Sequence, residues 1–268
     1  MLNLTQIVIM ILITIIFSLG SGLTGLSAVN LIAPMLIIFF TFTYYMSLGT
    51  SLFIDMINSG VVAYFYSKHK NVNYKIGILM GVISFTFAII GAIIAFALAD
   101  QLLLSSFGYF QIIIGCIFIW RGLRWTEPSE NRELQKSSLA LWFEEVSEKY
   151  KKIIIIIASV ILGLSGGLFG AGGGFVITFI LIFLLAFESH KAVGTACFVM
   201  LFTTLGAVFY YSIRGAINFS MGTILGPISI VGAFIGTQAA HKLSEKHLTI
   251  ILGIIIMLFG FIILFIPK

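Results

Sequence analysis

Long stretches of this chain contain no Asp, Glu, Lys, Arg or His, and this lack of charge limits the fold more than any other feature. Each has the roughly 20 residues with which a helix crosses the hydrocarbon core of a bilayer. Soluble proteins are about a quarter charged, whereas this chain is 60% hydrophobic and 9% charged. The runs are continuous and do not alternate, so they predict an all-α polytopic membrane protein and not a β-barrel. The stretches are Leu2–Ile54, Ile76–Ala99, Ile153–Phe187, Ala192–Ile213 and Leu248–Pro267.

The basic residues indicate an orientation. The net charge is +5, from 15 Lys and Arg against 10 Asp and Glu. Three basic residues lie in the loop at residues 68–75 and seven in the segment at residues 121–152. Cytoplasmic loops of membrane proteins carry an excess of Lys and Arg. We therefore expect both segments to face the cytoplasm, and the hairpin near Asp100 to face outside.

The chain contains an internal repeat. Gly22-Leu23-x-Gly25 reappears as Gly167-Leu168-x-Gly170, 145 residues later, and the register holds without a gap over about a hundred residues. At this offset Gly49-Thr50 matches Gly194-Thr195, Tyr66 matches Tyr211, Asn73 matches Asn218, and five further glycines match. The sequence predicts two tandem copies, residues 1–120 and 153–268, joined by a cytoplasmic linker at residues 121–152.

The number of membrane segments stays open between eight and ten. Residues 5–43 and 153–187 are each too long for one span and barely long enough for two, at about 1.5 Å per helical residue. Two crossings in each would give five-span units of inverted orientation, with thirteen of the basic residues inside. One crossing would give parallel four-span units with twelve inside. Inverted repeats are a common plan among transporters, so we favour inversion.

The stretch GLFGAGGGFV, residues 167–176, raises the question of a binding site. A nucleotide fingerprint needs a strand before its glycines, but here a membrane span precedes them. Glycines at 166, 170 and 174 have the spacing of close helix packing, which remains an alternative. Three consecutive glycines weaken a helix by about 1 kcal/mol each relative to Ala, so we expect a break. The N–H groups that begin the next half-helix would attract an anion.

The matching stretch of the first copy is GLTGLSAVNLIAP, residues 22–34. Ser27, Ala28 and Val29 lie opposite the three consecutive glycines, and Asn30 and Pro34 follow. Pro34 removes a backbone donor and kinks or breaks a helix. We therefore expect a second break here, with most of its glycines lost.

Polar residues inside the spans follow each Gly-Thr pair. Residues 51, 55, 58 and 59 share one helical face in the first copy, and we interpret it as a wet face, with interhelical hydrogen bonding as the alternative. Asp55 is the only acid well inside a span, where a charge is costly, so it is a candidate for coupling transport to a proton or an ion. The predicted substrate-binding residues are Gly25, Ser27, Asn30, Thr50, Ser51, Gly170, Gly172, Gly173, Gly174, Thr195 and Cys197.

Other site chemistries find little support. Ser27 and Ser165 have no plausible His and acid partners for nucleophilic catalysis, so we do not expect an enzyme. No Cys and His spacing suggests a metal site, and Cys116 and Cys197 lie in apolar spans, where a disulfide framework is not expected. We expect no cofactor and no nucleic-acid partner.

These features together resemble the TauE/SafE sulfite exporter family of membrane permeases. The resemblance rests on the two Gly-rich stretches and on the pairs Gly49-Thr50 and Gly194-Thr195, and it covers nearly the whole chain apart from the linker. It implies export or uptake of small anions, typically sulfur oxyanions such as sulfite, sulfonates, or related carboxylates, across the inner membrane of a bacterium or an archaeon. Since no Walker-type ATP site is present, we expect a secondary transporter, with an anion channel or a carboxylate transporter as the alternatives.

Overall fold

A computed structural model describes residues 4–25, 27–123, 148–170, 174–183, 185, 187–239 and 245–265. Within these residues every regular element is an α-helix, as predicted. The helices are α1 (Leu4–Thr24), α2 (Val29–Phe40), α3 (Tyr44–Lys68), α4 (Tyr74–Ala97), α5 (Asp100–Leu123), α7 (Glu148–Phe169), α8 (Gly174–Phe183), α9 (Ser189–Ile213), α10 (Phe219–Ala239) and α11 (Glu245–Phe265).

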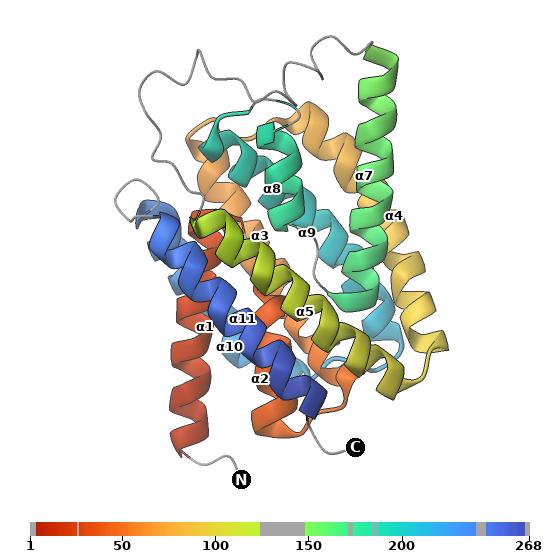
Figure 1. Cartoon of the computed structure of the whole chain (residues 1–268), viewed down its shortest axis with the longest axis vertical. Helices are drawn as coiled ribbons and strands as arrows, with labels where there is room; N and C mark the ends of the chain where they lie inside the picture. The colour runs from red at the N-terminus through yellow and green to blue at the C-terminus, as the bar shows by residue number, and fades with distance from the viewer. Residues whose placement is uncertain are drawn as a thin grey trace.

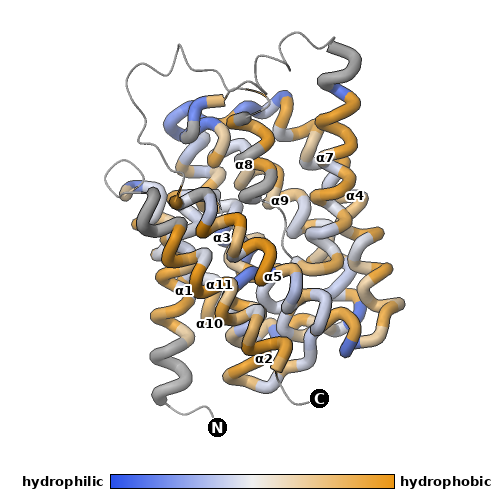
Figure 2. Tube along the Cα trace, in the orientation of Figure 1, coloured by the Kyte–Doolittle hydropathy of each residue, from blue (hydrophilic) through white to orange (hydrophobic). Residues whose placement is uncertain are grey.

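The helices have the length and composition of a polytopic membrane protein. Among the described residues, six are long and apolar enough to cross a bilayer, within α3, α4, α5, α7, α9 and α10, and shorter apolar helices accompany them. Large apolar side chains such as Ile113, Ile161 and Phe209 are more than half exposed, and Figure 2 shows apolar residues along most of the outer helices α4, α7 and α11. Such a surface suits lipid, so the predicted class is confirmed.

The linker at residues 121–152 is helical at both of its ends. Helix α5 continues to Leu123 and α7 begins at Glu148. The apolar span within α5 ends at Trp120, where the first copy was predicted to end. Residues 124–147 lie outside the described part of the chain.

The two halves of the chain interlock. Helix α1 packs along α10 and α7 packs along α4, while α3 pairs with α9 and α5 pairs with α11. Figure 1 shows α7 and α4 on one flank and α1 and α10 on the other. Glycines permit these close crossings: the α-carbon of Gly91 lies against the backbone oxygen of Leu164, and that of Gly236 lies against the oxygen of Leu19. Both members of the second contact lie 145 residues from their counterparts in the first.

Helices α3 and α9 run in opposite directions. The Thr50 hydroxyl, near the start of α3, accepts a hydrogen bond of 2.9 Å from the backbone N–H of Asn218, which follows α9. The Thr195 hydroxyl, near the start of α9, accepts one of 2.9 Å from the N–H of Asn73, which follows α3. Each Asn side chain then caps the next helix, by accepting from Met221 N and Ile76 N. The start of α9 therefore lies beside the basic loop at residues 68–75.

Candidate functional site

The first predicted break lies between α1 and α2. Helix α1 ends at Thr24 and α2 begins at Val29. Between them Gly25 has a φ of +73°, the left-handed conformation that glycine adopts without a steric penalty. The following helix runs only 12 residues, to Phe40. The break expected within residues 22–34 is therefore present.

The second predicted break lies between α7 and α8. Helix α7 ends at Phe169, Gly170 has a φ of +65°, and α8 runs for 10 residues from Gly174. Gly172 and Gly173, two of the predicted binding residues, lie outside the described part of the chain. The break expected within residues 167–176 is therefore present as well.

The two breaks meet in the interior of the bundle. The Gly25 carbonyl oxygen lies against the α-carbon of Gly174, and a Cβ atom added to Gly25 would lie 2.9 Å from the Thr178 hydroxyl of α8. A Cβ atom added to Gly170 would lie 2.7 Å from a methyl group of Val29, the first residue of α2. Side chains larger than hydrogen are thus excluded from the junction.

A buried carboxylate occupies the start of α2. Asp55 lies near the middle of the 25-residue helix α3 and is 0% exposed. Its oxygens accept hydrogen bonds from the Ser27 hydroxyl at 2.7 Å and from the Ala28 backbone N–H at 2.9 Å. The N-terminus of a helix carries a partial positive charge and unbonded N–H groups, which favour an anion. The first break therefore contains an anion that the protein itself supplies.

The second break has no such carboxylate from the neighbouring helix. The residue of α9 that corresponds to Asp55 is Met200, and its Sδ atom lies against Gly174 at the start of α8. Helix α9 contains no acidic residue. A thioether is at best a weak acceptor, so Met200 does not supply the negative charge that Asp55 brings to α2.

The side chains of Thr50 and Thr195 connect helix ends, and their hydrogen bonds are made away from the two breaks. Besides accepting from Asn218 and Asn73, their hydroxyls donate to Met46 O at 2.7 Å and to Lys191 O at 2.6 Å within their own helices. Both threonines are 0% exposed. Their protons and one lone pair each are thus used by protein groups.

The other predicted residues that the structure describes are buried. Ser51 donates to Ser47 O at 2.7 Å, on the same face of α3 as Asp55. Asn58, one turn beyond Asp55, donates to the Ser21 hydroxyl of α1 at 2.7 Å, and its Oδ1 atom has no hydrogen-bond partner among the described residues. The predicted polar face of α3 is therefore bonded partly to α1. Cys197 instead packs in an apolar cluster with Val62 and Tyr66.

Gln111 is a residue of the first break that the sequence analysis missed. Pro34 has no N–H to bond the carbonyl of Asn30, four residues earlier in α2. The Gln111 side chain of α5 supplies the missing donor, from Nε2 to Asn30 O at 2.7 Å. The residues 145 positions later are Phe179 for Pro34 and Ile256 for Gln111. Because the second copy lacks both Pro34 and Gln111, a comparison of the two copies could have indicated that these residues act together. No group of three His, Cys, Asp or Glu side chains suited to a metal occurs in the described residues.

Comparison with known proteins identifies the family of this chain. The model of the family "Sulfite exporter TauE/SafE" matches residues 10–263. The chain is 28% identical to the probable membrane transporter protein MJ0441 of Methanocaldococcus jannaschii, over 94% of this chain and 93% of that one. It is 23% identical to the probable membrane transporter protein YunE of Bacillus subtilis, over 91% and 90%. No solved structure matches. Because the family match covers nearly the whole chain, this protein belongs to the TauE/SafE family of membrane transporters.

Proposed function

We propose that this protein is a secondary transporter that moves a small anion across the cytoplasmic membrane by alternating access. The observation that carries the proposal is the pair of broken helices meeting inside an apolar bundle. Unwound backbone at membrane depth is tolerated where protein covers it or where it lines a wet cavity. Broken helices whose N-termini face the substrate are a recurring device of transporters.

The substrate site we propose is lopsided. The carboxylate of Asp55 already accepts a hydrogen bond from the backbone N–H of Ala28 before α2, so the anion binds mainly at the start of α8, which begins at Gly174. Gly172 and Gly173 stay predicted ligands from the sequence. Gly25, Ser27 and Asn30 form the other side of the site through the contact between Gly25 and Gly174. Thr50 and Thr195, which the sequence predicted as ligands, lie outside this site and join α3 and α9 to Asn218 and Asn73.

The family supports the substrate class. We propose a sulfur oxyanion or a sulfonate, such as sulfite or sulfoacetate. These anions are small and present several oxygen atoms, which suits a site of convergent backbone donors without a cationic side chain. Small carboxylates share this chemistry and form the comparison group in any test.

Asp55 is the proposed coupling residue. Two unit negative charges about 5 Å apart repel by about 3 kcal/mol at an effective dielectric constant of about 20. An anion at the start of α8 would therefore favour the protonated form of Asp55, and a proton would travel with the substrate.

The two copies are proposed to be inverted repeats. The reciprocal contacts between Thr50 and Asn218 and between Thr195 and Asn73 support this arrangement, because a two-fold axis in the membrane plane would produce them. The basic loop at residues 68–75 and the linker then both face the cytoplasm.

Flux into proteoliposomes tests the proposal. We expect sulfite or sulfoacetate to accumulate against its gradient when a proton gradient is imposed, and not in protein-free liposomes. A flat response to sulfite, thiosulfate, sulfoacetate and small carboxylates would overturn the anion assignment. Flux that only dissipates a gradient, at far higher turnover, would indicate a channel. Anomalous scattering from bound selenite would show whether the anion lies at Gly174.

A further inference from the structure

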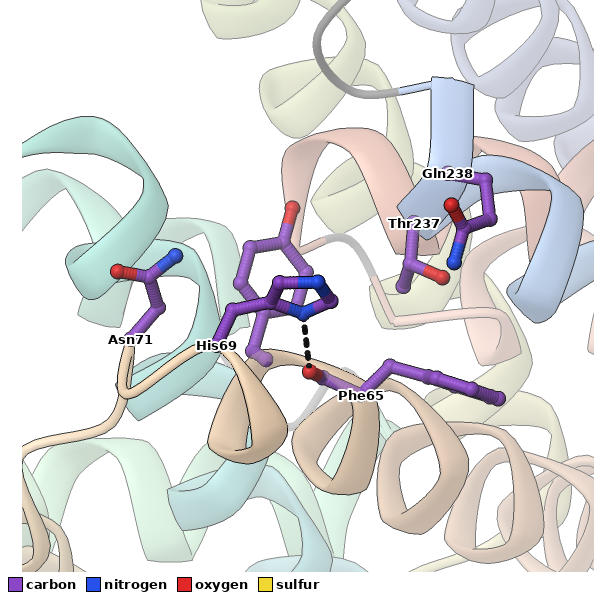
Figure 3. Close-up of a pocket in the computed structure, with 6 residues that line it drawn as sticks. Phe65, His69, Asn71, Thr237 and Gln238 are labelled. Carbon is purple, nitrogen blue, oxygen red and sulfur yellow. Dashed lines mark hydrogen bonds between the residues drawn. The ribbon is translucent and has the colours of Figure 1, made fainter.

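A polar hollow lies at the end of the bundle that carries the basic loop at residues 68–75. It has a volume of about 40 Å³, is partly open to solvent, and lies between the last turns of α3 and α10. Figure 3 shows His69 and Asn71 on one side and Thr237 and Gln238 on the other. His69 donates from Nδ1 to Phe65 O at 3.0 Å, which leaves its Nε2 atom for another partner. The full lining is Phe65, Tyr66, His69, Asn71, Thr237 and Gln238.

The hollow lies next to the helix that leads to the first break. Tyr66 forms part of the lining, and its hydroxyl donates to Gly22 O, in the last turn of α1, at 2.9 Å. A Cβ atom added to Gly22 would lie 2.8 Å from the backbone N of Thr237, another lining residue. Gly25, which opens the break, follows three residues later. Tyr66 therefore connects the hollow to the last turn of α1, which leads to the first break.

The corresponding position at the opposite end is covered by aromatic rings. Tyr211, the counterpart of Tyr66, donates to Gly167 O at 3.3 Å. Beside it Tyr45 stacks on Phe96 with ring centroids 4.5 Å apart, and the guanidinium of Arg214 lies 4.9 Å over the Phe96 ring. Phe96 also contacts Tyr211 edge-on at 5.0 Å. The residues that correspond to Asn71, Thr237 and Gln238 are Ala216, Ala92 and Ile93.

We infer that the hollow over Tyr66 is a passage site for the substrate anion, a small oxyanion, between the basic end of the bundle and the paired breaks. This inference rests on the proposed transport function. The Asn71 and Gln238 amides supply neutral donors, and exposed Lys68 and Lys70 make the surrounding potential positive. The Thr237 hydroxyl donates to Phe234 O at 2.9 Å, so it lines the hollow without adding a donor.

The same geometry makes the site weak. The hollow lies at the C-terminal ends of α3 and α10, where the helix dipole is negative and opposes an anion. A passage site must release its ion as readily as it binds it. In the hollow, the amide donors attract the anion while the C-terminal ends of α3 and α10 repel it, so binding is weak and release is fast. At the start of α8 the helix N-terminus attracts the anion, so binding there is stronger.

Charge substitutions at Gln238, which is exposed and distant from the proposed α8 site, test the inference. Gln238→Glu and Gln238→Lys change the charge of the hollow in opposite directions. Lys75→Gln is the matched control, because it also lowers the charge by one unit at the same end but lies outside the lining. The variants are reconstituted, and KM and kcat for sulfite and sulfoacetate flux are measured at low and high salt.

We expect Gln238→Glu to raise KM about fivefold at low salt and Gln238→Lys to lower it about twofold, with kcat nearly unchanged and both effects reduced at high salt. Lys75→Gln should change KM less than twofold. If both Gln238 variants shift KM in the same direction, or not at all, while the parent protein transports, the passage site is overturned and the proposed function stands. A parent protein that moves neither anion overturns the proposed function, and the passage site with it.

Discussion

The two helix breaks belong to two copies of the same repeat unit, but they differ in one respect. The first break has a buried carboxylate from the neighbouring helix α3, whereas α9, the corresponding helix at the second break, contains no acidic residue. In the first break, Asp55 bonds Ser27 and the Ala28 N–H, and Gln111 bonds the carbonyl that Pro34 leaves free. In the second break, glycines and Met200 occupy the corresponding positions. A helix N-terminus that is already paired with a buried carboxylate has little to offer an anion. This difference supports the proposal that the anion binds at the second break, whereas the first break has a structural role.

The polar residues of the first break are lost together in the second copy. Asp55 alone could be a chance substitution, but its neighbours change with it, and most of the replacements are apolar or glycine. The pairs, first copy then second, are Ser21 and Gly166, Ser27 and Gly172, Asn30 and Phe175, Asp55 and Met200, Asn58 and Thr203, and Gln111 and Ile256.

The largest effect is expected from removing the internal anion. Asp55→Ala leaves the Ser27 hydroxyl and the Ala28 N–H buried without an acceptor, and should lower the free energy of unfolding by about 4 kcal/mol, since two hydrogen bonds to a charged group are lost. Asp55→Asn keeps one acceptor oxygen and should lose less than half of that. Thermal unfolding in detergent measures both. Equal losses in the two variants would mean that the carboxylate is not what stabilises the start of α2.

Adding a carboxylate to the second break should weaken substrate binding strongly without preventing the protein from folding. Met200→Asp places a carboxylate where Asp55 stands in the first copy, close to Gly174, so the substrate must compete with it. We expect the KM for anion flux to rise about a hundredfold, equivalent to about 2.7 kcal/mol. Met200→Leu, which conserves volume, should change KM less than twofold. Unaltered flux in Met200→Asp would place the substrate elsewhere.

Gln111 should matter only while Pro34 is present. Gln111→Leu leaves Asn30 O buried without a donor and should cost about 1.5 kcal/mol of stability. In a Pro34→Ala background the restored N–H can bond Asn30 O, so the same substitution should cost less than about 0.5 kcal/mol. A double-mutant cycle from thermal or denaturant unfolding measures the coupling. Additive losses would show that Gln111 acts independently of the proline.

The sequence predicted the breaks but not how each is satisfied. Consecutive glycines and Pro34 weaken a helix through local backbone energetics, so both breaks could be located from the chain alone. The partners of Asp55 and Asn30 lie 27 and 81 residues away. Such pairings depend on how helices pack, which a hydropathy pattern does not encode. The offset of 145 is the exception, because it allowed residues in the two copies to be compared directly.

The smallest effect is expected from substituting Thr50 and Thr195. At these positions the two copies are alike, whereas at the breaks they differ. Each hydroxyl accepts a bond of 2.9 Å from the backbone N–H of an Asn that caps a helix of the other copy. Thr50→Val and Thr195→Val should each lower stability by about 1 kcal/mol and leave the KM for anion flux within twofold. A large rise in KM for either variant, without a loss of stability, would return that threonine to the substrate site. Equal and purely structural effects would show that the two copies use these threonines in the same way, in contrast to their breaks, where Asp55 of one copy corresponds to Met200 of the other.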